Sequence, residues 1–347
     1  MVNYFFISSP LHFFIATNIA IQKHADNNIA LFISKNKRTA ELYSSVITDN
    51  SDIFNHFEIL PVNDSKNKLA NRKQCFSLIE KILSETPAEQ IFTGNDARVE
   101  FQYAMHIARQ YKKEVAGIYI DDGLGSYLPH RSMNSFTRKY IETFIKKLTY
   151  GNWWKSPLSL GGSEWVTQAF LAYPELVHPL LIDKKLEKID DKIFEGPAFV
   201  KVCERLLQKQ TNDNPIDFNN IKVVICLTHD TIYLNYEKTL TQLRAIFESK
   251  CLPKEIAIKA HPRSKQNALI SQVFPNATIL PNKVGLELFL PHINNDTLIV
   301  GDISTTLLTS KWLKPNVQVG YFEAKTKAID SAGLMSLFDA LSIKCIK

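Results

Sequence analysis

The stretch EVAGIYIDDGLG, residues 114–125, joins a short apolar run to two adjacent carboxylates and two glycines. A run of this length, closed by turn-forming residues, is typical of a buried strand in a parallel sheet. Because side chains alternate between the faces of a strand, we expect Asp121 and Asp122 to point in different directions. Gly123 and Gly125 allow a sharp turn after them. The stretch therefore predicts a buried strand that ends in an acidic loop.

Similar runs recur in two series, separated by segments of helical pattern. The first series consists of residues 3–8, 28–34, 56–62, 90–94 and 114–120, and the second of residues 222–227, 255–260, 277–281, 296–301 and 316–322. Strands that alternate with helices form parallel, doubly wound sheets. The sequence thus predicts an α/β protein with two Rossmann-like halves, whose ligands bind beyond the carboxyl ends of the strands.

Between the two series, residues 151–215 contain most of the irregular signals, among them GNWWKSPLSLGG and QTNDNP. Such a composition suits a connection between domains. We therefore expect an N-terminal domain over residues 1–155, a linker over 156–215 and a C-terminal domain over 216–347.

Composition limits the classes of function. The chain has 347 residues, and its 41 Lys and Arg exceed its 35 Asp and Glu by 6. This mild excess fits an anionic substrate or a membrane surface and does not require nucleic acid. Five cysteines without a CxxC pair support neither a zinc site nor a disulfide framework. No apolar run approaches the roughly 20 residues that cross a bilayer, and no leader is recognisable, so we expect a cytoplasmic protein.

Three roles are open to the acidic loop. An Asx-type turn with solvated carboxylates is the plainer interpretation of a DDG sequence. A general base is the functional one, since a partly desolvated carboxylate at a strand end can take a proton from a hydroxyl. A metal site is weaker, because adjacent carboxylates on opposite faces seldom share one ion and no third ligand is near in the sequence.

The second half contributes a histidine to the loop after its second strand. His261, in HPRSK, is followed by two cations, so it can bind or protonate a phosphate leaving group, or it can serve only as a cap or core residue. Another His-Pro pair begins at His178, in the irregular connection, and is expected to be structural.

Hydroxyls and a carboxylate follow in the same half. Ser304, Thr305 and Thr306 precede a helical pattern, where free N–H groups and hydroxyls form either a phosphate site or a simple N-cap. Glu287 stands at a helix start and can accept hydrogen bonds from ribose hydroxyls or remain solvated.

Together these motifs resemble those of the bacterial sialyltransferases, which have an acidic-acidic-glycine motif, a His-Pro motif and a hydroxyl-rich motif. Here they are IDDGLGSY (120–127), IKAHPRS (258–264) and VGDISTTLL (300–308). Their order and spacing are most similar to the capsular polysialyltransferase family, and next to the lipooligosaccharide sialyltransferases. The opening ISSPLHFFIA resembles the first strand and loop of these enzymes. The resemblance implies the GT-B fold, with two Rossmann-like domains facing a central cleft, a CMP-sialic acid donor and no metal or other cofactor.

The resemblance also implies roles for single residues. Asp121, first of the acidic pair, would be the catalytic base, supported by Asp122 and Gly123. Asp230, in CLTHDTIY, is the rival base, because some lipooligosaccharide enzymes use an aspartate after the first strand of the C-terminal domain. His261 would engage the CMP phosphate as acid or electrostatic stabiliser. The donor would also contact Pro262, Glu287, Ser304, Thr305 and Thr306, and the acceptor side would include Ser9 and Asn95.

The expected reaction is an inverting, metal-independent transfer of sialic acid from CMP-Neu5Ac to a cell-surface glycan. Terminal galactose of lipooligosaccharide is the first acceptor expected, since the chain lacks long basic extensions that would hold a polyanion. One alternative is a capsular polysialyltransferase, and another is transfer of a different CMP-activated acid such as pseudaminic acid or Kdo. An alternative of another class is a non-catalytic nucleotide- or glycan-binding protein on the same scaffold.

A basic, apolar segment precedes the linker. SFTRKYIETFIKKLTYGNWWK, residues 135–155, places Phe136, Tyr140, Phe144 and Leu148 at helical spacing among lysines and arginines. Such a helix either packs on its own domain or lies against anionic lipid on the inner face of the cytoplasmic membrane. The sequence indicates no oligomeric state.

Overall fold

The chain divides into two compact units, Met1–Ile193 (unit 1) and Phe194–Lys347 (unit 2). The computed structural model describes residues 1–33, 37–48, 52–61, 68–128, 136–211, 216–325 and 332–346. The side chains of residues 37, 38, 48, 68, 69, 136–142 and 332 are outside this description.

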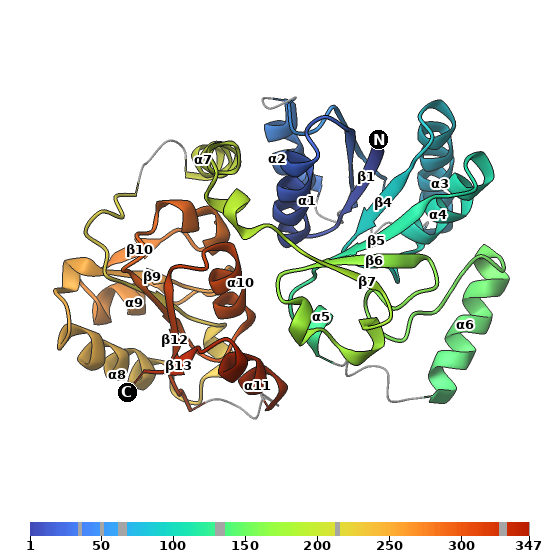
Figure 1. Cartoon of the computed structure of the whole chain (residues 1–347). Helices are drawn as coiled ribbons and strands as arrows, with labels where there is room; N and C mark the ends of the chain where they lie inside the picture. The colour runs from blue at the N-terminus through green and yellow to red at the C-terminus, as the bar shows by residue number, and fades with distance from the viewer. Residues whose placement is uncertain are drawn as a thin grey trace. The chain divides into compact units, whose positions relative to one another are not determined.

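Unit 1 contains a parallel sheet of seven strands in the order β3-β2-β1-β4-β5-β6-β7. The strands are β1 (Val2–Ile7), β2 (Asn27–Phe32), β3 (His56–Ile59), β4 (Gln90–Thr93), β5 (Ala116–Ile120), β6 (Val166–Leu171) and β7 (Lys185–Lys188). The helices are α1 (Pro10–Gln22), α2 (Lys37–Thr48), α3 (Lys68–Glu85), α4 (Val99–Tyr111), α5 (Leu124–Tyr127) and α6 (Phe136–Tyr150). Helices α1 and α2 lie on one side of the sheet, and α3 and α4 on the other (Figure 1).

The central strands are buried because helices cover both faces of the sheet. From Asn3 to Ile7, every residue of β1 is at most 3% exposed. Phe5 stacks on Phe92 of the neighbouring β4 with ring centroids 4.5 Å apart. Burial on both faces explains why these strands appear in the sequence as continuous apolar runs rather than as alternating ones.

Unit 2 contains a parallel sheet of six strands in the order β10-β9-β8-β11-β12-β13. The strands are β8 (Val223–Cys226), β9 (Ile256–Lys259), β10 (Thr278–Leu280), β11 (Leu298–Gly301), β12 (Gln318–Tyr321) and β13 (Lys344–Cys345). The helices are α7 (Pro197–Thr211), α8 (Tyr236–Glu248), α9 (Asn267–Val273), α10 (Thr305–Leu313) and α11 (Ala332–Ala340). Short 3-10 helices of the two units are η2 (Pro174–Leu176), η3 (Pro179–Leu181), η4 (Asp191–Glu195), η5 (Asp230–Ile232), η6 (Pro253–Glu255), η7 (Leu286–Leu288) and η8 (Leu290–His292).

The two predicted series of strands are confirmed, but the predicted linker differs from the structure. Residues 156–215 contain β6 and β7, which extend the first sheet, and α7, which belongs to unit 2. Strand β7 was missed because its sequence is KLEK. An edge strand with charged side chains lacks the apolar run of a central strand. Residues 212–215 of the predicted connection are outside the described part.

The described helices include none that is long and apolar enough to cross a membrane. All five cysteines are free thiols, of which Cys75, Cys203 and Cys226 are buried and Cys251 and Cys345 are partly exposed.

Candidate active site

Each sheet reverses its strand order at one point, and ligands of open α/β sheets bind beside such points. In unit 1 the reversal lies between β1 and β4, and in unit 2 between β8 and β11. The motifs found in the sequence follow these strands or their neighbours. The candidate functional residues therefore lie at the carboxyl edges of the two sheets.

In the acidic loop, Asp121 is a buried anchor. Its side chain is 1% exposed. Ser126 Oγ and the Gly123 N–H donate to Oδ1 at 2.7 and 2.9 Å, while the Tyr127 hydroxyl and the Ala172 N–H, the latter at 3.0 Å, donate to Oδ2. Burial raises the pKa of Asp121, and these hydrogen bonds oppose the rise. The carboxylate thus ties the acidic loop to the end of β6.

Asp122 is the accessible member of the pair, with a side chain 28% exposed. His12 Nε2 lies 2.5 Å from its Oδ1, and among the described residues no hydrogen bond reaches its Oδ2. The sequence predicted that the pair would face different ways, and it assigned the reactive role to Asp121. The hydrogen bonds place Asp121 in the interior and Asp122 at the surface, which favours the second residue for contact with substrate.

The other predicted residues of unit 1 shape the backbone of these loops. Gly123 has a φ of 74°, the left-handed region that favours glycine. The Ser9 side chain accepts a hydrogen bond from the His12 N–H at 3.2 Å and caps α1. Asn95 Oδ1 accepts from the Ala97 N–H at 3.1 Å. Ser9 and Asn95 are both partly exposed residues of loops at the carboxyl edge.

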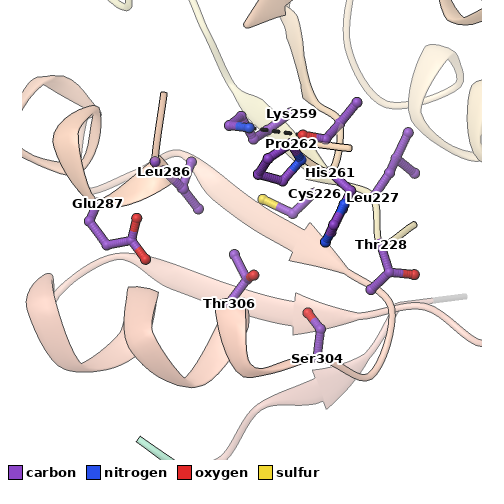
Figure 2. A pocket seen from close by; sticks show the side chains of 12 residues that line it. Cys226, Leu227, Thr228, Lys259, His261, Pro262, Leu286, Glu287, Ser304 and Thr306 are labelled. Atoms are coloured by element: carbon purple, nitrogen blue, oxygen red, sulfur yellow. Dashed lines mark hydrogen bonds between the residues drawn. The ribbon is translucent and has the colours of Figure 1, made fainter. Parts of the chain in front are cut away.

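In unit 2 a pocket lies at the point of strand reversal (Figure 2). It is lined by Cys226, Leu227, Thr228, Lys259, Ala260, His261, Pro262, Gly285, Leu286, Glu287, Ser304 and Thr306. Five of the residues predicted from the sequence to contact a donor are therefore together in one concave site. Figure 2 shows His261 approaching from one side and Ser304 and Thr306 from the other.

His261 follows β9 and has a defined tautomer. Its Nδ1 accepts the Arg263 N–H at 3.1 Å, so the proton of the neutral ring is on Nε2. The ring of His229, from the loop after β8, lies 5.2 Å away at 64°. Burial and, less strongly, the neighbours His229, Arg263 and Lys259 lower the pKa of His261 below its ordinary value. The free site thus presents a neutral imidazole with a donor N–H.

The hydroxyls come from the beginning of α10. Ser304 is the N-cap residue, yet its side chain makes no capping hydrogen bond, which leaves the hydroxyl to the pocket. Thr306 also lines the pocket, whereas Thr305 is exposed and does not. The first N–H groups of a helix and two hydroxyls form an anion-binding arrangement. Of the three hydroxyl residues predicted to contact the donor, Ser304 and Thr306 therefore line the pocket and Thr305 does not.

A partly buried acid, Glu287, and a buried base, Lys259, both line the pocket. Burial raises the pKa of Glu287, which is the acidic residue of η7. Lys259 is 6% exposed, and its Nζ donates to the carbonyl oxygens of Ala260 and Asn282 at 2.8 and 3.0 Å. Burial lowers the pKa of Lys259. Glu287, which the sequence assigned to a ribose, thus lines the pocket, and its contact with a ribose stays a prediction.

The rival base, Asp230, opens η5 beside the pocket but is not part of its lining. Its Oδ1 lies 2.9 Å from His229 Nδ1, and Ser264 Oγ donates to Oδ2 at 3.3 Å. Both oxygens are engaged and the side chain is 12% exposed. Asp230 therefore orders the loop that holds His229 against His261.

Asp302, between β11 and α10, joins two loops of the pocket. Its Oδ2 accepts hydrogen bonds from the Tyr233 hydroxyl at 2.5 Å and from the Thr228 hydroxyl. The residue is 5% exposed, and burial raises its pKa. This network fixes the loop of Thr228 against the loop of Ser304.

The sequence did not single out His12, His229 or Asp302. Each follows a strand that borders a reversal point, at β1, β8 or β11. A polar side chain directly after such a strand is the signal that would have found them. Their partners come from other loops, as many as 110 residues away in the case of His12.

Two parallel α/β sheets of this topology, each with the predicted motifs in loops at its carboxyl edge, form the GT-B fold. The GT-B domain of a sialyltransferase from Photobacterium damselae, residues 113–497, is 14% identical, with a TM-score of 0.59 over 99% of this chain and 98% of that one. The alpha/beta-galactoside alpha-2,3-sialyltransferase of Photobacterium phosphoreum is 12% identical, with a TM-score of 0.58 over 99% and 98%. At sequence identities this low, the similarity to these structures shows the fold alone.

The fold is shared more widely, since the UDP-GlcNAc 2-epimerase of Methanocaldococcus jannaschii is 14% identical, with a TM-score of 0.54 over 99% of this chain and 92% of that one. The fold alone therefore does not give the function, and the family model does. The alpha-2,8-polysialyltransferase (POLYST) family model matches residues 3–321, and the chain belongs to this family. It is a glycosyltransferase that transfers sialic acid, which confirms the resemblance in the sequence. No curated protein sequence matches the chain.

Proposed function

We propose that the protein transfers sialic acid from CMP-Neu5Ac to a cell-surface glycan, with inversion and without a metal ion. The observation that supports this most is the pocket of unit 2, where the His261 imidazole and the hydroxyls of Ser304 and Thr306 line one space. A helix start, hydroxyls and an imidazole suit one phosphate group. The leaving group CMP has a single phosphate, which these groups stabilise as its charge develops.

For the catalytic base we infer Asp122 in place of Asp121. Asp122 is 28% exposed and keeps one oxygen without a donor among the described residues, whereas Asp121 is buried with both oxygens in hydrogen bonds. A general base must reach the proton that it removes. Unit 1 would then supply the base and bind the acceptor, and unit 2 would bind the donor.

The reaction balances without a further reactant. Asp122 takes the proton of the acceptor hydroxyl, and the oxygen forms a bond to the anomeric carbon of sialic acid. The bond from that carbon to the phosphate oxygen breaks on the opposite side, and CMP leaves with the electron pair. The His261 N–H and the α10 hydroxyls stabilise the departing phosphate, and such donors each contribute about 3 to 4 kcal/mol in other enzymes.

The donor is tested by release of CMP. CMP-Neu5Ac, CMP-Kdo and CMP-pseudaminic acid are supplied in turn with a glycan acceptor, in the presence of EDTA. The proposal expects turnover with CMP-Neu5Ac that EDTA leaves unchanged, and an inverted anomeric configuration of the product by NMR. If only another donor is turned over, the transferred sugar is the one from that donor and not sialic acid.

Two acceptors remain as candidates. Terminal galactose of lipooligosaccharide is the first. The second is a glycan that already ends in sialic acid, as in a capsular polymer, and the description of the family as alpha-2,8-polysialyltransferases favours it. Labelled lactoside and labelled sialyl-lactoside separate them by mass: one added sialyl residue on lactoside supports the first, and a ladder on sialyl-lactoside supports the second.

We also propose that α6 meets anionic lipid on the inner face of the cytoplasmic membrane. Phe144, Ile145 and Leu148 of this helix are 65%, 55% and 73% exposed, and Lys147 beside them is exposed too. Apolar side chains with neighbouring cations suit a membrane interface. Lys146 is directed elsewhere, over the Trp154 ring at 4.5 Å, and the predicted contributions of Phe136 and Tyr140 lie outside the described side chains. Salt-sensitive co-sedimentation with anionic vesicles, lost in a Phe144→Ser, Leu148→Ser variant, tests this contact.

A further inference from the structure

The imidazole of His12 reaches across one strand of the first sheet to hold Asp122. His12 lies in the first turn of α1, after β1, whereas Asp122 follows β5, and β4 lies between these two strands. The Nε2 to Oδ1 distance is 2.5 Å, and the His12 side chain is only 2% exposed. A buried ring thus contacts a carboxylate that itself reaches solvent.

A glycine makes this crossing possible. A Cβ atom at Gly94, directly after β4, would lie 2.1 Å from His12 Nε2 and 2.4 Å from Cδ2. Real Cβ atoms do not approach other atoms so closely, so any larger residue at this position displaces the ring. The loop after β4 is therefore shaped around the imidazole.

The other ring nitrogen fixes the tautomer. The backbone N–H of Ser8 lies 3.4 Å from His12 Nδ1, and Ser8 Oγ lies 3.0 Å from the same atom. A backbone N–H can only donate, so Nδ1 is the acceptor and the proton of the neutral ring is on Nε2. His12 consequently donates its Nε2–H to Asp122 Oδ1.

We propose that His12 is a positioning residue for Asp122. It holds Oδ1 by a hydrogen bond and so turns Oδ2, which has no donor among the described residues, toward the acceptor hydroxyl. The role needs an N–H donor at this point and no proton transfer by the ring. This inference rests on the proposed function, because it assigns Asp122 the proton of the acceptor.

The test compares His12→Ala with His12→Gln in the full chain, using CMP-Neu5Ac and the labelled acceptor that the wild type uses. Glutamine can place an amide N–H close to the position of Nε2, whereas alanine cannot. We expect kcat to fall by about 100-fold in His12→Ala, the order of loss from a misplaced catalytic group. The KM for CMP-Neu5Ac should stay within about twofold in both variants, because the donor pocket is in unit 2, and most of kcat should return in His12→Gln.

A third variant changes neither His12 nor Asp122. Gly94→Ala leaves His12 and Asp122 unchanged in chemistry but displaces the ring, so it should lower kcat as His12→Ala does. Thermal unfolding and CMP affinity of each variant report whether the chain is folded. If His12→Ala does not fold, the kcat values of Gly94→Ala and His12→Gln test the positioning role. Equal losses in His12→Ala and His12→Gln, or full kcat in His12→Ala or in Gly94→Ala, would overturn the positioning role. A wild type that releases no CMP from CMP-Neu5Ac would instead remove the proposed function.

Discussion

Asp121 and Asp122 are adjacent in the chain, yet one is 1% exposed and anchors the loop while the other is 28% exposed and contacts His12. The division follows from the pleat of β5, which sends successive side chains to opposite sides. On the inner side, hydroxyl and N–H donors from the loop and from the end of β6 surround the carboxylate. One dipeptide thus combines a structural carboxylate with an accessible one.

Removal of the Asp121 charge should cost stability. In Asp121→Asn, an amide N–H₂ replaces one oxygen and meets donors that had an acceptor, and an unsatisfied buried group costs about 1–3 kcal/mol. We expect the free energy of unfolding to fall by that amount in urea denaturation. Asp183, exposed in the same unit, provides the control, and Asp183→Asn should leave stability unchanged. Equal stability of the two variants would contradict the anchoring role.

The hydroxyls at the start of α10 should differ in their effect on CMP binding. Ser304 and Thr306 line the pocket, and Thr305 between them does not. Loss of a hydrogen bond to a charged group costs about 1.5–3 kcal/mol, or roughly 10- to 150-fold in affinity. Calorimetry should therefore show weaker CMP binding in Ser304→Ala and in Thr306→Val, and little change in Thr305→Val. A loss confined to Thr305→Val would contradict this division between the two threonines.

CMP affinity should depend on pH through His261. Burial, with His229, Arg263 and Lys259, lowers the pKa of His261 below 6.5, so the ring is neutral in the free site at pH 7. A bound phosphate favours the protonated ring, and binding therefore takes up a proton. The affinity of the wild type, relative to His261→Asn, should rise as the pH falls from 7 through the range below 6.5. The ratio removes the titration of CMP itself, and a ratio independent of pH would contradict the expected contact.

Much of this architecture could be predicted from the sequence, because buried parallel strands form continuous apolar runs. The strands from β1 to β5 and from β8 to β12 were found in this way. The edge strands β7, with the sequence KLEK, and β13, with two residues, bury little and therefore left no apolar run to detect. The edge position explains why β7 was assigned to the predicted linker. The inner strand β6, VTQAFL, was assigned to it as well, because Thr167 and Gln168 interrupt its apolar run.

The site could be predicted as a set of loops but not as a set of contacts. Alternation along β5 indicated that the two aspartates would diverge, yet only packing against Tyr127 and Ala172 decides which one is buried. Likewise, the exact phase of α10 decides between Thr305 and Thr306. The contact of His12 with Asp122 depends on Gly94, a residue that has no side chain of its own.

The most direct test of the account measures transfer from CMP-Neu5Ac by the wild type and by Asp122→Asn, with mass detection of the labelled acceptor and calorimetry of CMP binding. We expect the wild type to add sialic acid and release CMP. Asp122→Asn should bind CMP equally well and lose about 100- to 10,000-fold in kcat, the usual contribution of a general base. Undiminished transfer by Asp122→Asn, or a wild type that transfers nothing from this donor, would contradict the account.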